Sequence, residues 1–356
     1  MTVSTPQSKG LDLCRILVDD PQKALELTGK GRTVALISNG GDLAGLEALG
    51  PQAALPYLEE QAYLIQKMTN LLALPLAVAA SSPEDIAAVT SFLAPSAGIL
   101  CLDGLDDQTY LAVDRILAPL ELPVFFHPQK SRPILILTAL ARGFALTGRE
   151  MAKARIVLSG FHDDSLAVVD LLLEAGASDL IVCDRSGAIH KGRPGPTSWL
   201  KERLALRTNP YEIKGGLNRA LSGADAYVSR ANPMALTKEI ASLMAPKPLI
   251  LNFSPNLLPP GPLAAANGPI GLGFGPGPAT RLPVNLLTPL VLAGLFAGAL
   301  KARAKNLGPA LGLAVARALE ELTDEPDRLL PTYSRPDLVE KVAAKVALSQ
   351  NGLNNL

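Results

Sequence analysis

Several residue types are scarce in this chain, and each scarcity excludes a class of function. Aromatic residues make up 4% of the 356 residues and include a single Trp, so stacking platforms for single-stranded nucleic acid are not expected. Basic and acidic residues both number 33, and a net charge of zero gives no electrostatic basis for binding nucleic acid or an anionic membrane. The remainder, 48% hydrophobic and 19% charged, is the composition of a globular protein long enough for two domains.

Cysteine and histidine are scarce as well. Cys14, Cys101 and Cys183 are odd in number and widely separated, which is typical of a reducing compartment rather than of a disulfide framework. The three histidines have no metal-ligand spacing. The first ten residues are polar and lack the apolar core of a secretion signal, so we expect a cytoplasmic protein.

One long and strongly apolar stretch lacks charge. It runs over 19 residues from Leu282 to Leu300, a length sufficient to cross a bilayer. Pro283, Asn285 and Pro289 interrupt it, and no second such stretch exists in the sequence. We therefore expect a buried helix packed between domains and no membrane span.

The segment that organises the chain reads as strand, turn, helix, strand. Ile156 to Leu158 form a short β-rich run, and apolar residues then recur at helical spacing from Leu166 to Leu173. Gly176 ends that helix, and Leu180 to Cys183 form a second apolar strand closed by Asp184. This pattern predicts the first βαβ half of a dinucleotide-binding fold, with an acidic residue about 20 residues beyond the turn.

The phosphate-binding turn of that unit is altered. A G-x-G-x-x-G motif would begin at Gly160, but His162 fills the position that must lack a side chain, and Ser165 replaces the last glycine. Asp163 and Asp164 suit a helix N-terminus but repel a pyrophosphate. His162 is also a titratable group in a cleft, although a histidine in such a turn more often only hydrogen-bonds locally. The pattern thus predicts a dinucleotide-binding fold whose phosphate-binding turn is altered.

Alternating strands and helices indicate an α/β chain with several parts. The helix that starts at Pro51 is expected to be regular only after Pro56, and the Pro- and Gly-rich segment 254–280 is expected to be an irregular loop. The predicted parts are a disordered tail (1–10), an N-terminal α/β domain (11–130), a linking helix (131–152), a Rossmann-like doubly wound parallel-sheet domain (153–280) and C-terminal helices that pack back across the domains (281–356).

Three stretches resemble the malic enzymes of bacteria and archaea. Gly29 to Ala62, GKGRTVALISNGGDLAGLEALGPQAALPYLEEQA, is similar to the family's K-G-N-x-V-A-V-V-S-[DN]-G and A-A-L-P-x-x-E-G-K segments. Ile181 to Gly195, IVCDRSGAIHKGRPG, resembles I-V-C-D-x-x-G-x-I-x-x-G-R, and Gly294 to Leu307, GLFAGALKARAKNL, resembles G-I-F-R-G-A-L-x-x-R-A. The matches lie in the family's order and at compatible spacings across residues 11–325, so the chain is identified as a member of that family.

The resemblance implies a definite catalytic set, because malic enzymes oxidise and decarboxylate malate with NAD or NADP and a divalent metal. The chain departs from this set throughout. Leu27 stands where the family has a proton-donating tyrosine, and Gln61, which has no titratable proton, stands where it has a lysine base. Asp103 and Gly104 replace the Glu-Asp metal ligands, and Pro128 lies where the next carboxylate ligand is expected. Mg²⁺ and Mn²⁺ need several oxygen ligands, so no divalent metal is expected.

Two further groups of residues carry alternative interpretations. Lys130 and Arg132 place positive charge where the metal would lie, which allows a small-anion site; ordinary surface charge or a salt bridge to Asp103 is the alternative. Gly160, Asp184 and Arg185 are the positions that the resemblance assigns to the cofactor. Asp184 would contact an adenosine ribose, or would simply cap the turn at the end of its strand.

We therefore predict a malic-enzyme-like protein that has lost malate oxidation and acts as a non-catalytic regulatory or structural subunit or as a small-anion binder. The alternative is an NAD(P)-dependent malic enzyme with atypical site residues. NAD or NADP is implied by the family resemblance alone. The expected assembly is a homo-oligomer, a dimer by resemblance, or a hetero-oligomer with an active malic enzyme.

Overall fold

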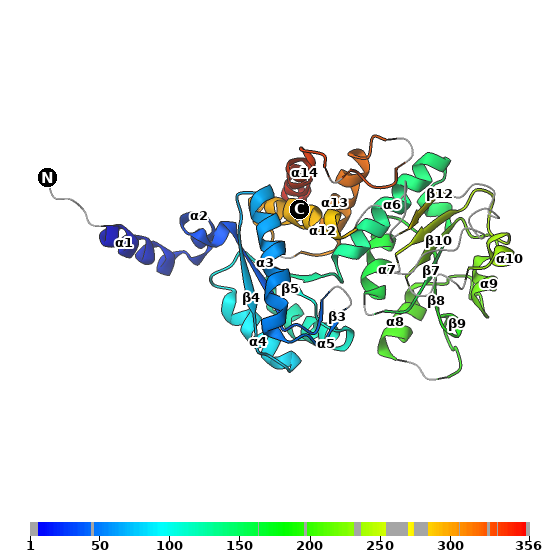
Figure 1. Cartoon of the computed structure of the whole chain (residues 1–356), viewed down its shortest axis with the longest axis horizontal. Helices are drawn as coiled ribbons and strands as arrows, with labels where there is room; N and C mark the ends of the chain where they lie inside the picture. The colour runs from blue at the N-terminus through cyan, green and yellow to red at the C-terminus, as the bar shows by residue number, and fades with distance from the viewer. Residues whose placement is uncertain are drawn as a thin grey trace. The chain divides into compact units, whose positions relative to one another are not determined.

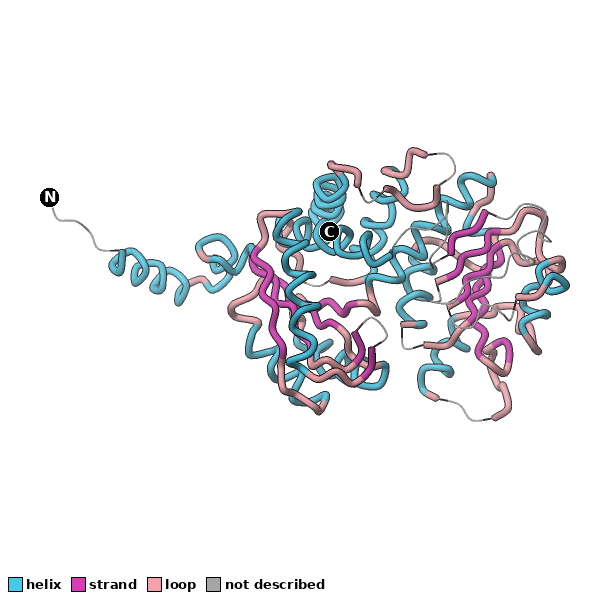
Figure 2. Tube along the Cα trace, viewed as in Figure 1, coloured by secondary structure: helices cyan, strands magenta, loops and turns pink. Residues whose placement is uncertain are grey.

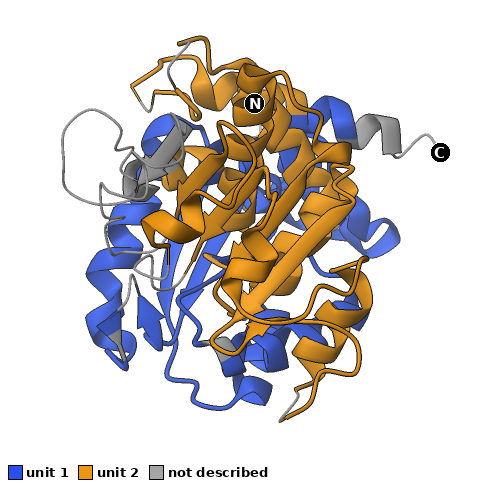
Figure 3. Ribbon diagram, turned by 90° about the vertical axis from the view of Figure 1, so that its right-hand side faces the viewer, with its two compact units in different colours: residues 1–127, 292–307, 346–356 blue, residues 128–291, 308–345 orange. Residues whose placement is uncertain are grey.

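The computed structural model (Figure 1) divides into two compact units, which Figure 3 colours separately. Unit 1 comprises residues 1–127, 292–307 and 346–356, and unit 2 comprises 128–291 and 308–345. Asp163 and most of the predicted loop 254–280 lie outside the described residues. The structure describes residues 6–43, 46–162, 164–195, 198–230, 236–253, 270–273, 284–305, 307–325, 328–332 and 334–353.

Unit 1 is built on a four-stranded parallel sheet in the order β4-β1-β5-β6. The central strands are buried along their whole length, as expected for strands covered on both faces. A small antiparallel pair, β2 and β3, follows β1. The strands are β1 (Thr33–Ser38), β2 (Asp42–Leu43), β3 (Leu46–Glu47), β4 (Leu72–Ala77), β5 (Ile99–Asp103) and β6 (Val124–His127).

Helices alternate with these strands (Figure 2). Ser82 caps α4 as its pattern predicts, because its Oγ accepts a hydrogen bond from the Asp85 backbone N–H at 3.1 Å. The helices are α1 (Pro6–Asp19), α2 (Ala24–Leu27), α3 (Pro51–Met68), α4 (Pro83–Leu93) and α5 (Asp107–Leu117), with the later residues of α12 (Val284–Lys301) and α14 (Leu338–Leu353).

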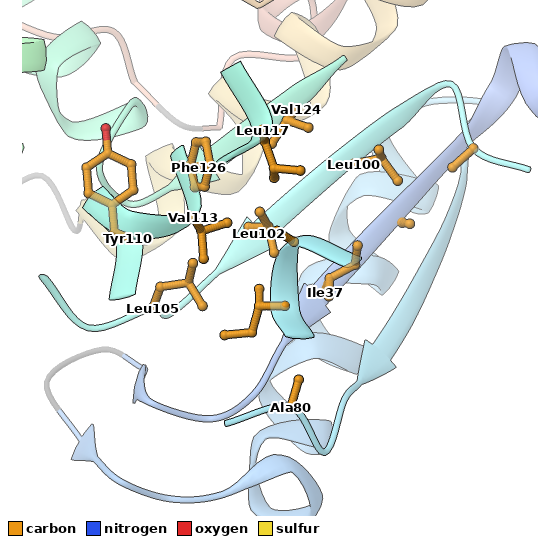
Figure 4. Packing of buried hydrophobic residues seen from close by; sticks show 14 residues of the cluster. Ile37, Ala80, Leu100, Leu102, Leu105, Tyr110, Val113, Leu117, Val124 and Phe126 are labelled. Atoms are coloured by element: carbon orange, nitrogen blue, oxygen red, sulfur yellow. The ribbon is translucent and has the colours of Figure 1, made fainter. Parts of the chain in front are cut away.

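Side-chain alternation along β6 shows how the two faces of the unit 1 sheet are covered. Phe126 packs edge-to-face on Tyr110 of α5, with ring centroids 5.0 Å apart, inside the cluster drawn in Figure 4. Phe125 points to the other face and meets Phe296 of α12 in the same edge-to-face manner at 5.6 Å. Consecutive residues thus serve opposite faces, as the period-2 geometry of a strand requires.

Unit 2 has a six-stranded sheet in the order β12-β11-β10-β7-β8-β9, in which only β9 is antiparallel. With β7 as the first strand, the parallel strands read 2-1-3-4-5, one of the doubly wound orders. The chain therefore reverses its direction of winding between β7 and β10. The strands are β7 (Arg155–Ser159), β8 (Asp179–Asp184), β9 (Gly187–Ala188), β10 (Ala226–Ser229), β11 (Leu249–Asn252) and β12 (Ile270–Gly273).

Helices cover both faces of this sheet. The apolar helices α6, α7 and α13 pack on one another, and Gly143 of α6 lets its backbone approach Leu249 of β11 closely. Residues from α9 and α10 pack with Tyr227 and neighbouring strand residues in a second buried cluster. The helices are α6 (Ser131–Thr147), α7 (Ser165–Glu174), α8 (Trp199–Arg207), α9 (Leu217–Leu221), α10 (Lys238–Ala241) and α13 (Pro309–Glu321), with the earlier residues of α12 and α14.

Three details differ from the sequence-based predictions, and the first is that strand β12 (Ile270–Gly273) lies within the segment 254–280 that was predicted to be an irregular loop. Helix α1 begins at Pro6, within the segment predicted to be a disordered tail, because Pro favours the first helical position and apolar residues follow. Helix α3 begins at Pro51 and continues without a break through Pro56, so the regular helix does not wait until after Pro56 as predicted. The uncharged stretch was predicted to be a helix, and its residues 284–300 lie in α12. Among the described residues no helix is both long and apolar enough to cross a bilayer.

Candidate functional site

The carboxyl ends of β7 and β10 lie side by side at the point where the winding of unit 2 reverses. Ser159 and Ser229 are paired in register at these ends. The Arg230 backbone N–H donates to the Ser159 carbonyl at 2.7 Å, and Gly160 continues the chain from β7 with a φ of 110°. In open parallel sheets a crevice at such a reversal is the usual ligand position, which makes this edge the candidate site of unit 2.

A buried ion cluster occupies this edge. The Asp164 side chain is fully buried, and it forms an ion pair with Arg230, whose side chain is 1% exposed. Arg132, in the first turn of α6, places its Nη1 3.2 Å from Asp164 Oδ2 and keeps 38% of its side chain exposed. A carboxylate at zero exposure persists only because these guanidinium groups replace its hydration.

Hydrogen bonds fix the turn that carries the carboxylate. Ser165 Oγ accepts from the His162 backbone N–H at 2.9 Å and from Arg230 Nη1 at 3.1 Å. His162 Nε2 lies 3.0 Å from the Arg230 carbonyl oxygen. His162 and Ser165 are therefore structural members of the turn, while a catalytic role for His162 stays untested.

These contacts do not fit a bound pyrophosphate. The first turn of a helix offers free N–H groups and a positive dipole end to a phosphate. Here α7 starts beside a carboxylate of its own chain, at Asp164, and His162 supplies a side chain where a bare backbone is needed. The Asp164 carboxylate already occupies the guanidinium groups of Arg132 and Arg230, so the residues present do not fit a dinucleotide phosphate at this turn.

Asp184 closes β8 and forms a second, separate ion cluster in unit 2. Its Oδ1 accepts from Arg193 Nη2 at 2.7 Å and from the Ser186 backbone N–H at 2.8 Å, and its Oδ2 lies 2.9 Å from Lys201 Nζ. Burial alone would raise the pKa of Asp184, but the hydrogen bonds from Arg193 and Lys201 hold it below its ordinary value. Arg185 is exposed. Asp184 thus caps its turn, and ribose contact stays a prediction.

A surface pocket of about 310 Å³ adjoins this second cluster. Its walls are the segment after β9 and one face of α8, with Arg193 and Lys201 on the side of Asp184. The Lys201 ammonium also lies 5.2 Å from the centroid of the Phe161 ring. The pocket is basic, yet both of these cations are already engaged by Asp184.

In unit 1 the position expected to ligate metal holds one buried carboxyl. Asp103 ends β5 and is 3% exposed, and desolvation raises its pKa to about 8 despite a hydrogen bond from the Gly104 backbone. Gly104 turns the chain away with a φ of 64°, and its N–H donates to the His127 carbonyl at 3.1 Å. Asp103 thus offers a single buried carboxyl, whereas a hard divalent cation takes several oxygen ligands.

The surroundings of Asp103 are apolar and weakly acidic. Burial raises the pKa of Cys101 well above its usual range, and burial together with the nearby Asp103 raises the pKa of Tyr57 on α3. Gln61, one turn further along α3, is 8% exposed. Leu27 ends α2 and is 36% exposed. Neither Gln61 nor Leu27 exchanges a proton near neutral pH, so neither supplies the base or the acid that malate oxidation requires.

The donor set of unit 1 does not fit a divalent metal. Gly104 and Pro128 have no side-chain oxygen. Within the described part of the chain, no group of three or more His, Cys, Asp or Glu side chains is placed to hold an ion. Mg²⁺ and Mn²⁺ keep several oxygen ligands, and one carboxyl does not meet that need.

The structure brings together some of the predicted residues. Arg132, Asp164, His162 and Ser165 share one cluster, whereas Asp184 belongs to another. Arg132 forms an ion pair with Asp164, whereas the predicted alternative was a salt bridge to Asp103; the small-anion site stays a prediction. Lys130 is the N-cap residue of α6.

Three residues were missed by sequence reasoning: Arg193, Lys201 and Arg230. Arg230 follows β10, far along the chain from Asp164, and no local pattern links them. Arg193 and Lys201 lie within 17 residues of Asp184 along the chain. Basic residues so soon after an acidic residue at a strand end could have predicted these ion pairs.

No protein-family model matches the chain. Curated relatives do. The chain is 29% identical over 339 residues to a bifunctional malic/malolactic enzyme of Bacillus subtilis, covering 94% of this chain and 81% of the relative. It is 29% identical over 343 residues to an NAD-dependent malic enzyme of Geobacillus stearothermophilus, covering 94% of this chain and 69% of the relative. The chain is thus similar to malic enzymes over most of its length, which supports membership of that family.

Solved malic enzyme structures share the fold of this chain. A malic enzyme from Pyrococcus horikoshii superimposes with a TM-score of 0.85 at 23% identity, covering 98% of this chain and 83% of that one. An NAD-dependent malic enzyme from Thermotoga maritima gives 0.84 at 24% identity, covering 97% and 91%. The predicted α/β architecture with a Rossmann-like sheet is therefore confirmed.

Proposed function

We propose that this malic enzyme homologue does not oxidise malate and serves as a non-catalytic structural or regulatory subunit, or as a binder of small anions. The observation that carries the proposal is the state of Asp103. It is the one carboxyl at the position where the resemblance expects metal ligands, and it is buried with its pKa raised to about 8.

Two further positions support the proposal independently. Gln61 stands where the resemblance expects the lysine base, and its amide neither takes up nor releases a proton in the physiological range. In unit 2, Asp164 lies at the start of α7, where a dinucleotide phosphate would need an uncharged turn. Restoring malate chemistry thus needs changes in both units.

The second candidate is an NAD(P)-dependent malic enzyme that oxidatively decarboxylates malate with atypical residues. The comparisons favour it over the first candidate, because curated relatives that align with 94% of this chain carry malic enzyme activity in their names. The side chains of the site favour the first. Fold and ancestry alone do not decide between the two, since one fold hosts active and inactive proteins.

The deciding experiment measures the reduction of NAD⁺ and NADP⁺ by the full chain with L-malate, in the presence of Mn²⁺ or Mg²⁺. We expect no rate above that of the heat-denatured chain. The Bacillus subtilis relative, assayed in parallel, serves as the positive control. Saturable, metal-dependent formation of NADH or NADPH would establish the second candidate instead.

An Asp103→Asn variant identifies contaminating activity in this assay. A genuine metal-dependent activity would need the only carboxyl at the metal position and would disappear in the variant. A rate that survives the substitution unchanged therefore comes from a contaminating enzyme and leaves the first candidate standing. A rate lost on substitution would refute it.

We further infer that the protein is cytoplasmic and assembles as a homo-oligomer or with an active malic enzyme. Helix α1 supports assembly, because Leu11 and Val18 are 63% and 81% exposed on it. Light scattering of the purified chain, alone and mixed with an active malic enzyme from the same cell, tests this. A strictly monomeric chain in both samples would contradict it.

A further inference from the structure

Three charged side chains meet at the reversal point of the unit 2 sheet. Asp164 follows β7, Arg230 follows β10, and Arg132 reaches the same point from α6. Two guanidinium groups therefore converge on one carboxylate at the edge where open parallel sheets take their ligands.

The pattern of burial separates the three members. Asp164 and Arg230 are buried almost completely, at 0% and 1% side-chain exposure, whereas Arg132 is 38% exposed. Guanidinium forks match oxyanions such as carboxylate and phosphate closely, so the two arginines form a receptor for one small oxyanion.

We propose that this receptor is an anion site whose resident anion is the chain's own Asp164, which excludes small oxyanions by occupying their place. The class of ligand is a small oxyanion, formate or inorganic phosphate being the simplest examples. The inference goes beyond the proposed function, because the changes in unit 1 alone would abolish malate oxidation without any role for Asp164.

The neighbouring groups are arranged to accept a replacement anion. Ser165 Oγ already lies 3.1 Å from Arg230 Nη1, so a hydroxyl donor stands beside the receptor. The exposed part of Arg132 provides the side from which a solute enters. Removal of the Asp164 carboxylate opens a space of roughly its own size between these cations.

The test replaces Asp164 with alanine in the full chain and measures thermal stability against increasing formate, acetate and inorganic phosphate. Wild type and an Asp170→Ala variant are titrated in parallel. Asp170 is the matched control, because it lies on the same helix and pairs with Arg207, yet both side chains are about one-third exposed. Chloride is added to bring all samples to the same ionic strength, so that electrostatic screening by salt is the same in each.

We expect Asp164→Ala to lose several degrees of melting temperature and to regain most of the loss with saturable dependence on formate or phosphate. Wild type and Asp170→Ala should show no saturable gain. An Asp164→Ala chain that is folded but indifferent to all three anions overturns the proposal, as does one that remains unfolded at every anion concentration.

A double variant, Asp164→Ala with Arg230→Met, separates the receptor from a general effect of salt. It removes both buried charges together, so it is expected to fold more stably than Asp164→Ala alone. It should not respond to formate or phosphate. A response equal to that of Asp164→Ala would show that Arg230 is not part of the site and would overturn the assignment.

Discussion

Replacing Asp103 with asparagine isolates the cost of burying a carboxyl at the end of β5. Asparagine has nearly the same shape as the protonated acid and carries no charge at any pH. The wild-type carboxyl is buried beside Tyr57 and Cys101, and burial raises its pKa to about 8. The substitution therefore removes a titration and leaves the packing almost unchanged.

The sign and size of the effect follow from linkage. Between about pH 4 and pH 8 the unfolded chain has released the Asp103 proton while the folded chain keeps it, so stability falls as pH rises. Each pH unit costs about 1.4 kcal/mol in that window, and the full shift from 3.8 to about 8 corresponds to about 6 kcal/mol. The cost is absent below the unfolded pKa and complete above the folded pKa.

Urea unfolding of wild type and Asp103→Asn at about pH 5, 6, 7 and 8 measures this directly. The difference between the two curves cancels the titration of every other group. Relative to wild type, we expect the free energy of unfolding of the variant to rise by about 1.4 kcal/mol per pH unit, with a smaller increment close to pH 8. Parallel curves, or a wild type that becomes relatively more stable with rising pH, would show that Asp103 is ionised in the folded chain and would refute the reasoning.

Three further predictions concern the local structure. Ser82→Ala removes the N-cap of α4 and should lower the free energy of unfolding by about 1 kcal/mol, as measured by urea denaturation. Gly187→Ala adds a Cβ 2.1 Å from the Gly215 carbonyl oxygen, at a residue with a φ of 108°. Thermal unfolding should therefore show that the free energy of unfolding falls by more than about 1 kcal/mol. The control Gly148→Ala places its Cβ in open space and should lose less. Asp184→Asn should lower the free energy of unfolding by about 2 kcal/mol near neutral pH, because Arg193 and Lys201 lose their counter-ion. The difference between variant and wild type should vanish as pH falls through the lowered pKa of Asp184. A difference that persists in acid would contradict this.

The βαβ unit and the later strands of unit 2 were predictable because their signals are local. Ile156 to Leu158 lie in β7, Leu180 to Cys183 lie in β8, and the predicted strand Ala226 to Ser229 is β10. Short apolar runs bounded by turn residues carry this information without any knowledge of the fold. The differences from the family at Gln61 and Gly104 could likewise be identified from the sequence, because each is a single position within a long stretch of resemblance.

The state of the site was not predictable, because it depends on contacts between distant segments. Asp164 was expected to repel a phosphate, but its neutralisation by Arg230 requires that β7 and β10 be neighbours. The pKa of Asp103 depends on burial under α3 and adjacent strands, which composition does not reveal. Local patterns thus fix the elements, while the electrostatics of the site comes from how the sheets are ordered.

The most direct test of the central claim is a titration of the chain with Mn²⁺, followed by electron paramagnetic resonance, in the presence of malate and NAD⁺. The account predicts that the signal of free Mn²⁺ grows in proportion to the metal added, because the single carboxyl of Asp103 does not supply the several oxygen ligands that the ion needs. Loss of one equivalent of free Mn²⁺ per chain in wild type, and its return in Asp103→Asn, would contradict it.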